Sequence, residues 1–163
     1  MQITHFGHAC VLVDTGAARL LFDPGGTFSS GFEKLGGIDA ILVTHQHADH
    51  LDEDRLAPLL AANPEARLIV DIGTSSMLHD YTHEVVAPGG ESFSVAGAAI
   101  DVLGGDHEVI HPDIPIVPNN GYLIDGSTLH PGDSFTPAPG ELDVLLLPTG
   151  APCSSCPTPS TTC

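Results

Sequence analysis

Short apolar or alternating runs follow one another along the first forty residues. They predict strands over 2–6, 9–14 and 19–23, each separated from the next by a break that contains glycine. Strands spaced so closely predict hairpins, because only a few residues are left to connect them. A further apolar run, 38–43, predicts another strand, and it ends directly on a group of histidines.

The segment 52–63 changes to a helical period. Leu56, Leu59 and Leu60 recur at helical spacing, and three acidic residues occupy the first turn, where negative charge suits the helix dipole. Pro64 follows and marks the end, because the residue before a proline avoids helical geometry. The pattern therefore predicts one amphipathic helix here.

The second half of the chain returns mainly to short strands. The pattern predicts a strand over 67–71 and a short helix over 74–80. Further strands are expected at 84–86, 92–95, 99–103, 121–124 and 142–147. Strands with interspersed helices and several hairpins predict an α/β fold with mixed sheets rather than a pure βαβ repeat.

Composition narrows the class of protein. The 163 residues are 42% hydrophobic, which suits one globular domain. With 4 Lys and Arg against 21 Asp and Glu, the net charge is −17, and so few cations cannot form a patch for nucleic acid or an anionic membrane surface. The sequence shows neither an apolar stretch of membrane-spanning length nor the pattern of a secretory signal. We therefore expect a cytoplasmic protein with no nucleic-acid or membrane partner.

The strongest chemical signal is the sequence His45-Gln46-His47-Ala48-Asp49-His50, which follows a predicted buried strand. Three imidazoles and a carboxylate so close together are hard to explain by packing, although a polar loop with fortuitous histidines is the alternative. In an extended turn, His45 and His47 can bind one divalent ion, while Asp49 and His50 reach a second. Zinc accepts such nitrogen and oxygen ligands, and paired metals are a known hydrolytic device.

The same motif resembles the metallo-β-lactamase-fold hydrolases. The agreement covers about residues 1–150 and extends to segments similar to the ascorbate-6-phosphate-lactonase-like branch: Ile3 to Cys10, Leu20 to Pro24, Asn120 to Ile124 and His130 to Ser134. The resemblance implies an α/β fold, an αββα four-layer sandwich with mixed sheets. It also implies a metal-dependent hydrolase of a small-molecule substrate.

The resemblance further implies a set of ligands for two divalent ions, most often zinc, with manganese or iron as alternatives. The set is His45, His47 and His107 for the first ion, Asp49 and His50 for the second, and Asp133 bridging both. His111, four residues after His107, is a rival for the third ligand of the first ion. We favour His107, because it lies closer to the end of a strand and a rigid element holds a ligand best.

Other residues have two interpretations or a structural one. Asp23 suits either a ligand-orienting partner, as the resemblance implies, or an ordinary turn, and His8 lies at a strand end near the expected site. We expect structural roles for the remaining candidates, with Cys10 buried as a small hydrophobic residue and His130 in a strand. The others are His5, His79 and His83.

The predicted ligands suggest a mechanism. Two cations that share a water lower its pKa and supply hydroxide at neutral pH, while one cation polarises the scissile carbonyl or phosphoryl oxygen. Asp49 is the predicted catalytic residue, because its carboxylate could accept a proton from that water. The substrate could be an ester, a lactone or a phosphodiester, and the sequence does not choose among them.

The end of the sequence departs from the family pattern. The family's last helix and strand, which carry a final histidine for the second metal, have no match here, so we expect an incomplete domain over 1–150. Residues 151–163 contain only Ala, Pro, Cys, Ser and Thr and predict an irregular tail. A frameshift within 153–163 is one hypothesis, and a zinc or redox pair at Cys153 and Cys156 is a weaker one.

These departures keep two other functions open. The chain could be a metal-binding but catalytically weak remnant of a hydrolase. It could instead be an interaction module that forms a homo-oligomer through the sheet face left uncovered. Hydrolysis of lactones and phosphodiesters, with His47→Ala as a control, would distinguish an enzyme from a remnant.

Overall fold

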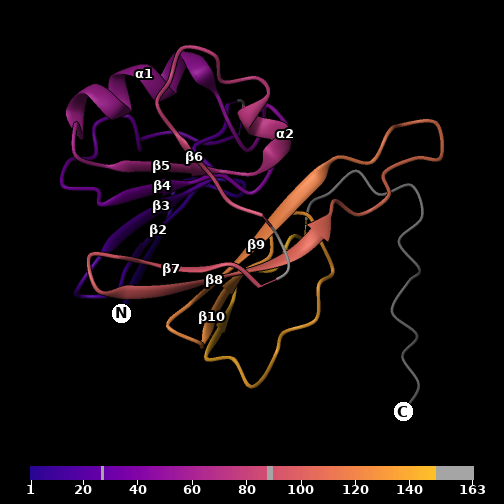
Figure 1. Cartoon of the computed structure of the whole chain (residues 1–163). Helices are drawn as coiled ribbons and strands as arrows, with labels where there is room; N and C mark the ends of the chain where they lie inside the picture. Colours follow the sequence, from indigo (N-terminus) through magenta and orange to yellow (C-terminus); the bar gives the residue numbers. More distant parts are fainter. Residues whose placement is uncertain (27, 88–89, 150–163) are drawn as a thin grey trace.

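A computed structural model describes residues 1–26, 28–87 and 90–149, which form two β-sheets packed face to face with helices outside one of them (Figure 1). The predicted tail, 151–163, lies outside the described residues. The first sheet has the order β1 (Gln2–His5), β2 (Val11–Asp14), β3 (Arg19–Phe22), β4 (Ala40–Leu42), β5 (Arg67–Val70) and β6 (Glu84–Val85).

This first sheet is half antiparallel and half parallel. Strands β1, β2 and β3 pair as successive antiparallel hairpins, as the sequence predicted. From β3 to β6 the pairing is parallel, with helical connections after β4 and β5. The carboxyl ends of these parallel strands meet at one edge, which is where ligand sites form in open α/β sheets.

The second sheet is mostly antiparallel. Its order is β11 (Val144–Leu145), β10 (Thr128–His130), β9 (Pro118–Ile124), β8 (Ala98–Asp106) and β7 (Ser92–Val95). Among the described strands of this second sheet, β10 and β11 form the one parallel pair. The two sheets together confirm the prediction of mixed sheets.

Two helices cover the outer face of the first sheet (Figure 1). Helix α1 (Glu53–Ala62) begins after Asp52, whose side chain accepts a hydrogen bond from the backbone N–H of Asp54. Helix α2 (Ile72–Ser75) begins after Asp71 in the same way. Within the described residues no helix covers the second sheet, so three of the four expected layers are present.

Successive side chains along the central strands point to opposite faces of the first sheet, so the hydrophobic core has two parts. Leu20, Phe22 and Leu42 face the second sheet and pack with Ile100 and Tyr122. Their neighbours face the helices instead, in a second buried cluster that includes Leu21, Ile41, Leu56 and Leu59. A sheet buried on both faces produces the continuous apolar runs seen in the sequence.

Four predicted elements differ from the structure, and one of them, the strand predicted over 142–147, is limited to Val144–Leu145. The short helix occupies 72–75 rather than 74–80, because Asp71 caps the N–H groups of Gly73 and Thr74 and so starts the helix earlier. Strands β8 and β9 are longer than predicted, because they pair with each other as far as Asp106 and Pro118.

No helix among the described residues has the length and apolar character needed to cross a membrane.

Candidate metal centre

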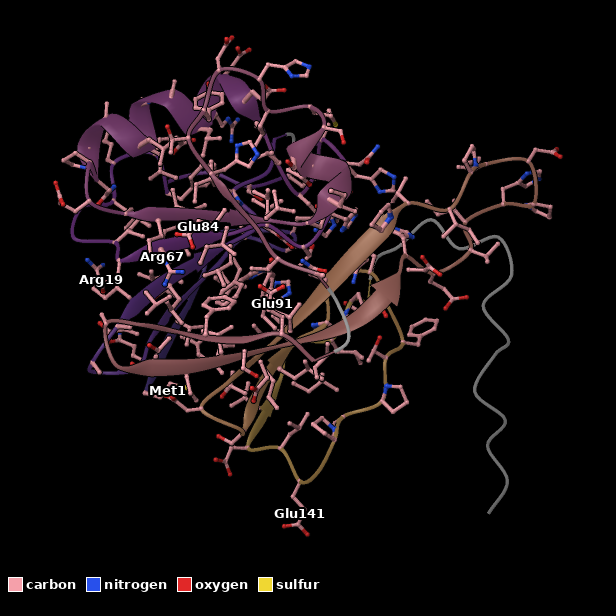
Figure 2. All side chains as sticks on the ribbon, in the orientation of Figure 1. Met1, Arg19, Arg67, Glu84, Glu91 and Glu141 are labelled. Carbon is pink, nitrogen blue, oxygen red and sulfur yellow. The ribbon has the colours of Figure 1, made fainter. Side chains whose placement is uncertain are left out.

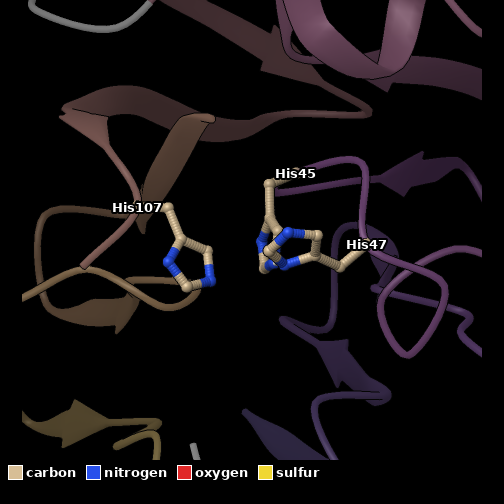
Figure 3. A group of neighbouring side chains, drawn as sticks. All are labelled: His45, His47 and His107. Carbon is tan, nitrogen blue, oxygen red and sulfur yellow. The ribbon is translucent and has the colours of Figure 1, made fainter. Parts of the chain in front are cut away.

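The predicted ligands come together where both sheets end. His45, His47, Asp49 and His50 lie in the loop that follows β4, while His107 directly follows β8 of the other sheet. Figure 3 shows the His107 ring pointing across the gap between the sheets toward His45 and His47. The site therefore exists only when the two sheets are packed against each other.

Three imidazoles form what we call the three-histidine group: His45, His47 and His107. Their candidate ligand atoms all lie within 4.8 Å of one another. His45 Nε2 is 3.0 Å from His47 Nδ1, and the ring centroid of His107 is 4.7 Å from that of His45. Nitrogens bound tetrahedrally to one zinc ion would be about 3.3 Å apart, so the grouping has the compactness of a single site.

A second set, which we call the carboxylate group, contains His8, Asp49 and His50. Their ligand atoms also lie within 4.8 Å of one another, and His8 Nε2 is 3.0 Å from Asp49 Oδ2. Asp133 lies between the two groups, because its Oδ2 is 3.4 Å from His107 Nε2 and 3.7 Å from His50 Nε2. This is the position that a bridging carboxylate would need.

Asp23 binds the His50 imidazole through Nδ1, the ring nitrogen that faces away from Asp133. His50 Nδ1 donates to Asp23 Oδ2 over 2.8 Å, and the same carboxylate accepts from the N–H and hydroxyl of Thr44. The carbonyl of Asp23 also accepts from the N–H of Gly25, so Asp23 is part of a turn as well. Asp23 therefore lies in a turn and also orients His50, while its role as the partner of a metal ligand stays a prediction.

Two glycines let the site loops approach closely. A Cβ on Gly25 would lie 1.8 Å from the backbone oxygen of Asp49. Gly132 has φ +61°, and a Cβ there would lie 2.3 Å from Asn119 Oδ1. Because Asn119 Oδ1 also accepts from the N–H of Asp133, Gly132 lets the turn that carries this carboxylate pack closely.

The two groups differ in protonation. Burial, reinforced by the charge of His50, lowers the pKa of His45 to about 2, and burial also lowers the pKa of His47. Burial alone would lower the pKa of His50 too, but the carboxylates of Asp23 and Asp133 outweigh it and raise that pKa to about 10.

The pKa values of Asp133 and His107, which lie beside His50, are shifted as well. Burial alone would raise the pKa of Asp133, yet His107 and His50 hold it far below its usual range. The same carboxylate raises the pKa of His107 against the effect of burial. The protein without metal therefore holds an anion at Asp133 and a cation at His50 in contact.

The donor set fits divalent metal ions. Nε2 of His50 and His107 are buried without a hydrogen-bond partner of normal geometry, which is costly for a polar atom unless something else binds it. The Nδ1 atoms of His50 and His107 lie 2.8 Å from Asp23 Oδ2 and 2.6 Å from the carbonyl of Glu108, respectively. A hydrogen on Nδ1 directs Nε2 into the site, as in metal-binding histidines, and the Nε2 lone pair is free once that atom carries no proton.

The remaining histidines lie elsewhere. His111, the rival third ligand, is half-exposed beside Asp113 and joins neither group. His130 lies in β10, as predicted, and stacks on Phe22 with ring centroids 5.2 Å apart. Cys10 is buried, also as predicted. His5 bonds to the backbone carbonyl of His8, but neither it nor His79 nor His83 belongs to one of the two groups.

Sequence reasoning did not identify His8 as a candidate ligand. It follows β1 by three residues, and only the hairpin register of the first sheet brings it to Asp49. The sequence offers only the preceding Gly7 as a sign of a turn; in the structure His8 adopts φ 47°, an uncommon conformation that often marks a functional position. Asp23 shares this left-handed conformation with φ 44°.

Comparisons of the sequence find similar proteins. The family model described as "Beta-lactamase superfamily domain" matches residues 2–159. Protein Rv0786c of Mycobacterium tuberculosis is 47% identical over 93% of this chain and 73% of its own length. A UPF0173 metal-dependent hydrolase of Salinibacter ruber is 30% identical over 92% of this chain and 73% of its own length.

A solved structure shows the same fold. CmlA, a diiron β-hydroxylase from Streptomyces venezuelae, superposes on 81% of this chain with a TM-score of 0.63 and 27% sequence identity. The matched part is only 29% of that structure, so this chain spans less than a third of its length. The expected sandwich with mixed sheets is therefore confirmed.

Proposed function

Since this chain belongs to the beta-lactamase superfamily, we propose that it is a hydrolase that uses two divalent metal ions on a small-molecule ester, lactone or phosphodiester. The UPF0173 relatives named as metal-dependent hydrolases support the reaction class. The observation that carries the proposal is the set of buried imidazole nitrogens that converge on Asp133 without hydrogen-bond partners.

The two groups suggest which residues would hold the ions. His45, His47 and His107 would hold the first, while Asp49, His50 and the newly placed His8 would hold the second, with Asp133 between them. Divalent ions bound there would polarise the scissile oxygen and acidify a water molecule. Zinc suits these ligands, and iron is the main alternative, because a diiron enzyme shares the fold.

The residues of the chain would then position groups and move protons. Asp49 is partly exposed, with a side chain 35% accessible, so its carboxylate can reach a water proton as a general base. Without metal, His8 Nε2 lies 3.0 Å from Oδ2 of Asp49, so the two side chains already face each other. Asp23 and Thr44 keep the His50 ring in one orientation.

Metal-dependent turnover of generic probes tests the proposal. The protein is stripped with a chelator, reloaded with zinc, manganese or ferrous iron, and assayed on p-nitrophenyl butyrate, a γ-lactone and bis(p-nitrophenyl) phosphate. We expect hydrolysis of at least one probe to return with metal. His47→Ala should lower it at least about 100-fold, because the first ion loses a ligand.

Two other histidines provide matched controls for that substitution. His79→Ala and His111→Ala should keep the activity of the parent protein, because neither residue joins the two groups. Loss of activity in His111→Ala with retention in His107→Ala would contradict the ligand set. Absence of metal-dependent turnover on all three probes would contradict the proposed function.

A further inference from the structure

A cavity of about 450 Å³ opens beside the carboxylate group. His8 and Asp133 lie at one side of it, and the chain from Leu145 to Pro148 lies at the other. Cavities that bind small molecules have volumes of about 300–1,000 Å³, so this one is large enough for a substrate. Leu145 and Leu147 are 47% and 59% exposed, so they present aliphatic surface at its wall.

Most polar groups in this wall are already engaged. His130 uses both ring nitrogens, with the carbonyl of Ala9 and the N–H of Gly132. His5 Nε2 bonds to the carbonyl of His8, and His8 Nε2 contacts Asp49. A ligand in this cavity therefore meets leucine side chains and few hydrogen-bond donors.

Apolar side chains also surround the three-histidine group. Ile114 and Ile116, in the loop between β8 and β9, line a small hollow at His47 and His107, and they are 48% and 55% exposed. On the other side, the exposed ring of Phe28 lies 5.8 Å from the ring of His8. Exposed hydrophobic residues concentrated around a site indicate an apolar ligand.

Cations are absent from both cavities. Among the residues that the structure describes, no lysine or arginine lines either one. Arg19, Arg55 and Arg67 are all paired with carboxylates of the first sheet and its neighbouring segments. Arg19 and Arg67 lie at the left of the molecule in Figure 2, whereas the loop 107–117 lies at its right side in Figure 1. Phosphate groups away from a metal centre are usually bound by such cations, so a second phosphate on the substrate, remote from the reacting bond, would find none here.

The substrate must also approach a negative protein. The chain has a net charge of −17, and Asp133 and Glu108 add carboxylates to the two cavities. An anionic group on the substrate, away from the reacting bond, would be repelled and would lose its hydration without gaining a partner.

We propose, on the basis of the proposed function, that the substrate is an uncharged carboxylic ester or lactone with an aliphatic substituent. Its reacting carbonyl lies at the two groups, and its aliphatic part lies against Leu145, Leu147 and the Ile114 to Ile116 loop. The side chains around the metal centre thus favour an uncharged, aliphatic ester over an anionic phosphodiester.

A series of esters with one leaving group tests this. Zinc-loaded protein is assayed with p-nitrophenyl acetate, butyrate and hexanoate, with p-nitrophenyl pentanoate against mono-p-nitrophenyl glutarate, and with bis(p-nitrophenyl) phosphate. We expect kcat/KM to rise with acyl length, by up to about fourfold for each methylene that is buried. The glutarate ester, which carries a carboxylate, should react at least about tenfold less efficiently than the pentanoate.

Variants locate the effect. Leu147→Ser and Ile116→Ser should flatten the dependence of kcat/KM on acyl length. Ile72→Ser is the matched control, because Ile72 is 56% exposed and lines neither cavity. In that control the dependence on acyl length should stay as in the parent protein.

The failures are distinguishable. A flat length dependence, or a glutarate ester that reacts as well as the pentanoate, would overturn the substrate class while leaving metal-dependent hydrolysis in place. The same holds if the phosphodiester shows the larger rate acceleration over its uncatalysed reaction. No turnover of any probe by protein that binds metal would contradict the proposed function, and this inference with it.

Discussion

The three-histidine group and the carboxylate group stand side by side but differ in charge. His45 and His47 are neutral at pH 7, because burial lowers the pKa of both imidazoles. His50 is a cation, because Asp23 and Asp133 raise its pKa to about 10. The first group thus offers mostly free lone pairs to a metal, whereas the second must first lose a proton.

The two groups also depend on different parts of the fold. The three-histidine group needs both sheets, because His107 follows β8 and the other two histidines follow β4. The carboxylate group needs only the first sheet, since His8 follows β1 and the other two residues lie after β4. Asp133 couples them, so the order of metal binding and its pH dependence should separate the groups experimentally.

Asp133→Asn should have the largest effect on this comparison. The substitution removes the charge that contacts both groups, so we expect loss of the second metal ion and a fall in hydrolysis of at least about 100-fold. Metal content and turnover measure this. Asp113→Asn is the control, because that carboxylate is 91% exposed. Retention of two metal ions and parent activity in Asp133→Asn would contradict the bridging position.

Asp23→Asn should have a smaller and more selective effect. The variant loses the carboxylate that accepts from His50 Nδ1, so affinity for the second metal should fall about 10–100-fold. Calorimetric titration of the metal-free protein would resolve the two binding steps. The first step should keep its affinity, and equal weakening of both steps would show that Asp23 supports the whole site instead.

The pH dependence of the affinity for the second metal ion should be the smallest of the three effects. Below pH 10 the His50 imidazole is protonated without metal, so binding of the second ion releases that proton and its affinity rises with pH. One proton corresponds to about a tenfold rise for each pH unit between 6.5 and 8. Calorimetric metal titrations in buffers of different ionisation enthalpy give the number of protons released on binding. A second step that releases none would contradict the protonated His50.

Local sequence patterns predicted most of the first sheet and helix α1. Hairpins and apolar strands have strong short-range signals, and Asp52 marks the start of α1 through a contact only two residues away. The extent of β8 and β9 could not be predicted in this way, because their ends are set by pairing between two distant segments.

As with the strands, the part of the site that lies within one short segment could be predicted from the sequence, and the distant residues could not. The motif from His45 to His50 is local and strong, whereas His107 and Asp133 could be named only by resemblance to a family. His8 was missed as a ligand candidate, because its contact with Asp49 joins residues 8 and 49 through the fold. Left-handed backbone at His8 and Asp23 is visible only in three dimensions.

The most direct test of the metal centre is the metal content of natively purified, monodisperse protein, measured by inductively coupled plasma mass spectrometry beside His45→Ala. His45 is fully buried among the other candidate ligands, so we expect about two equivalents in the parent chain and loss of at least the first in the variant. Near-zero metal in the parent, or equal metal in both proteins, would contradict the account.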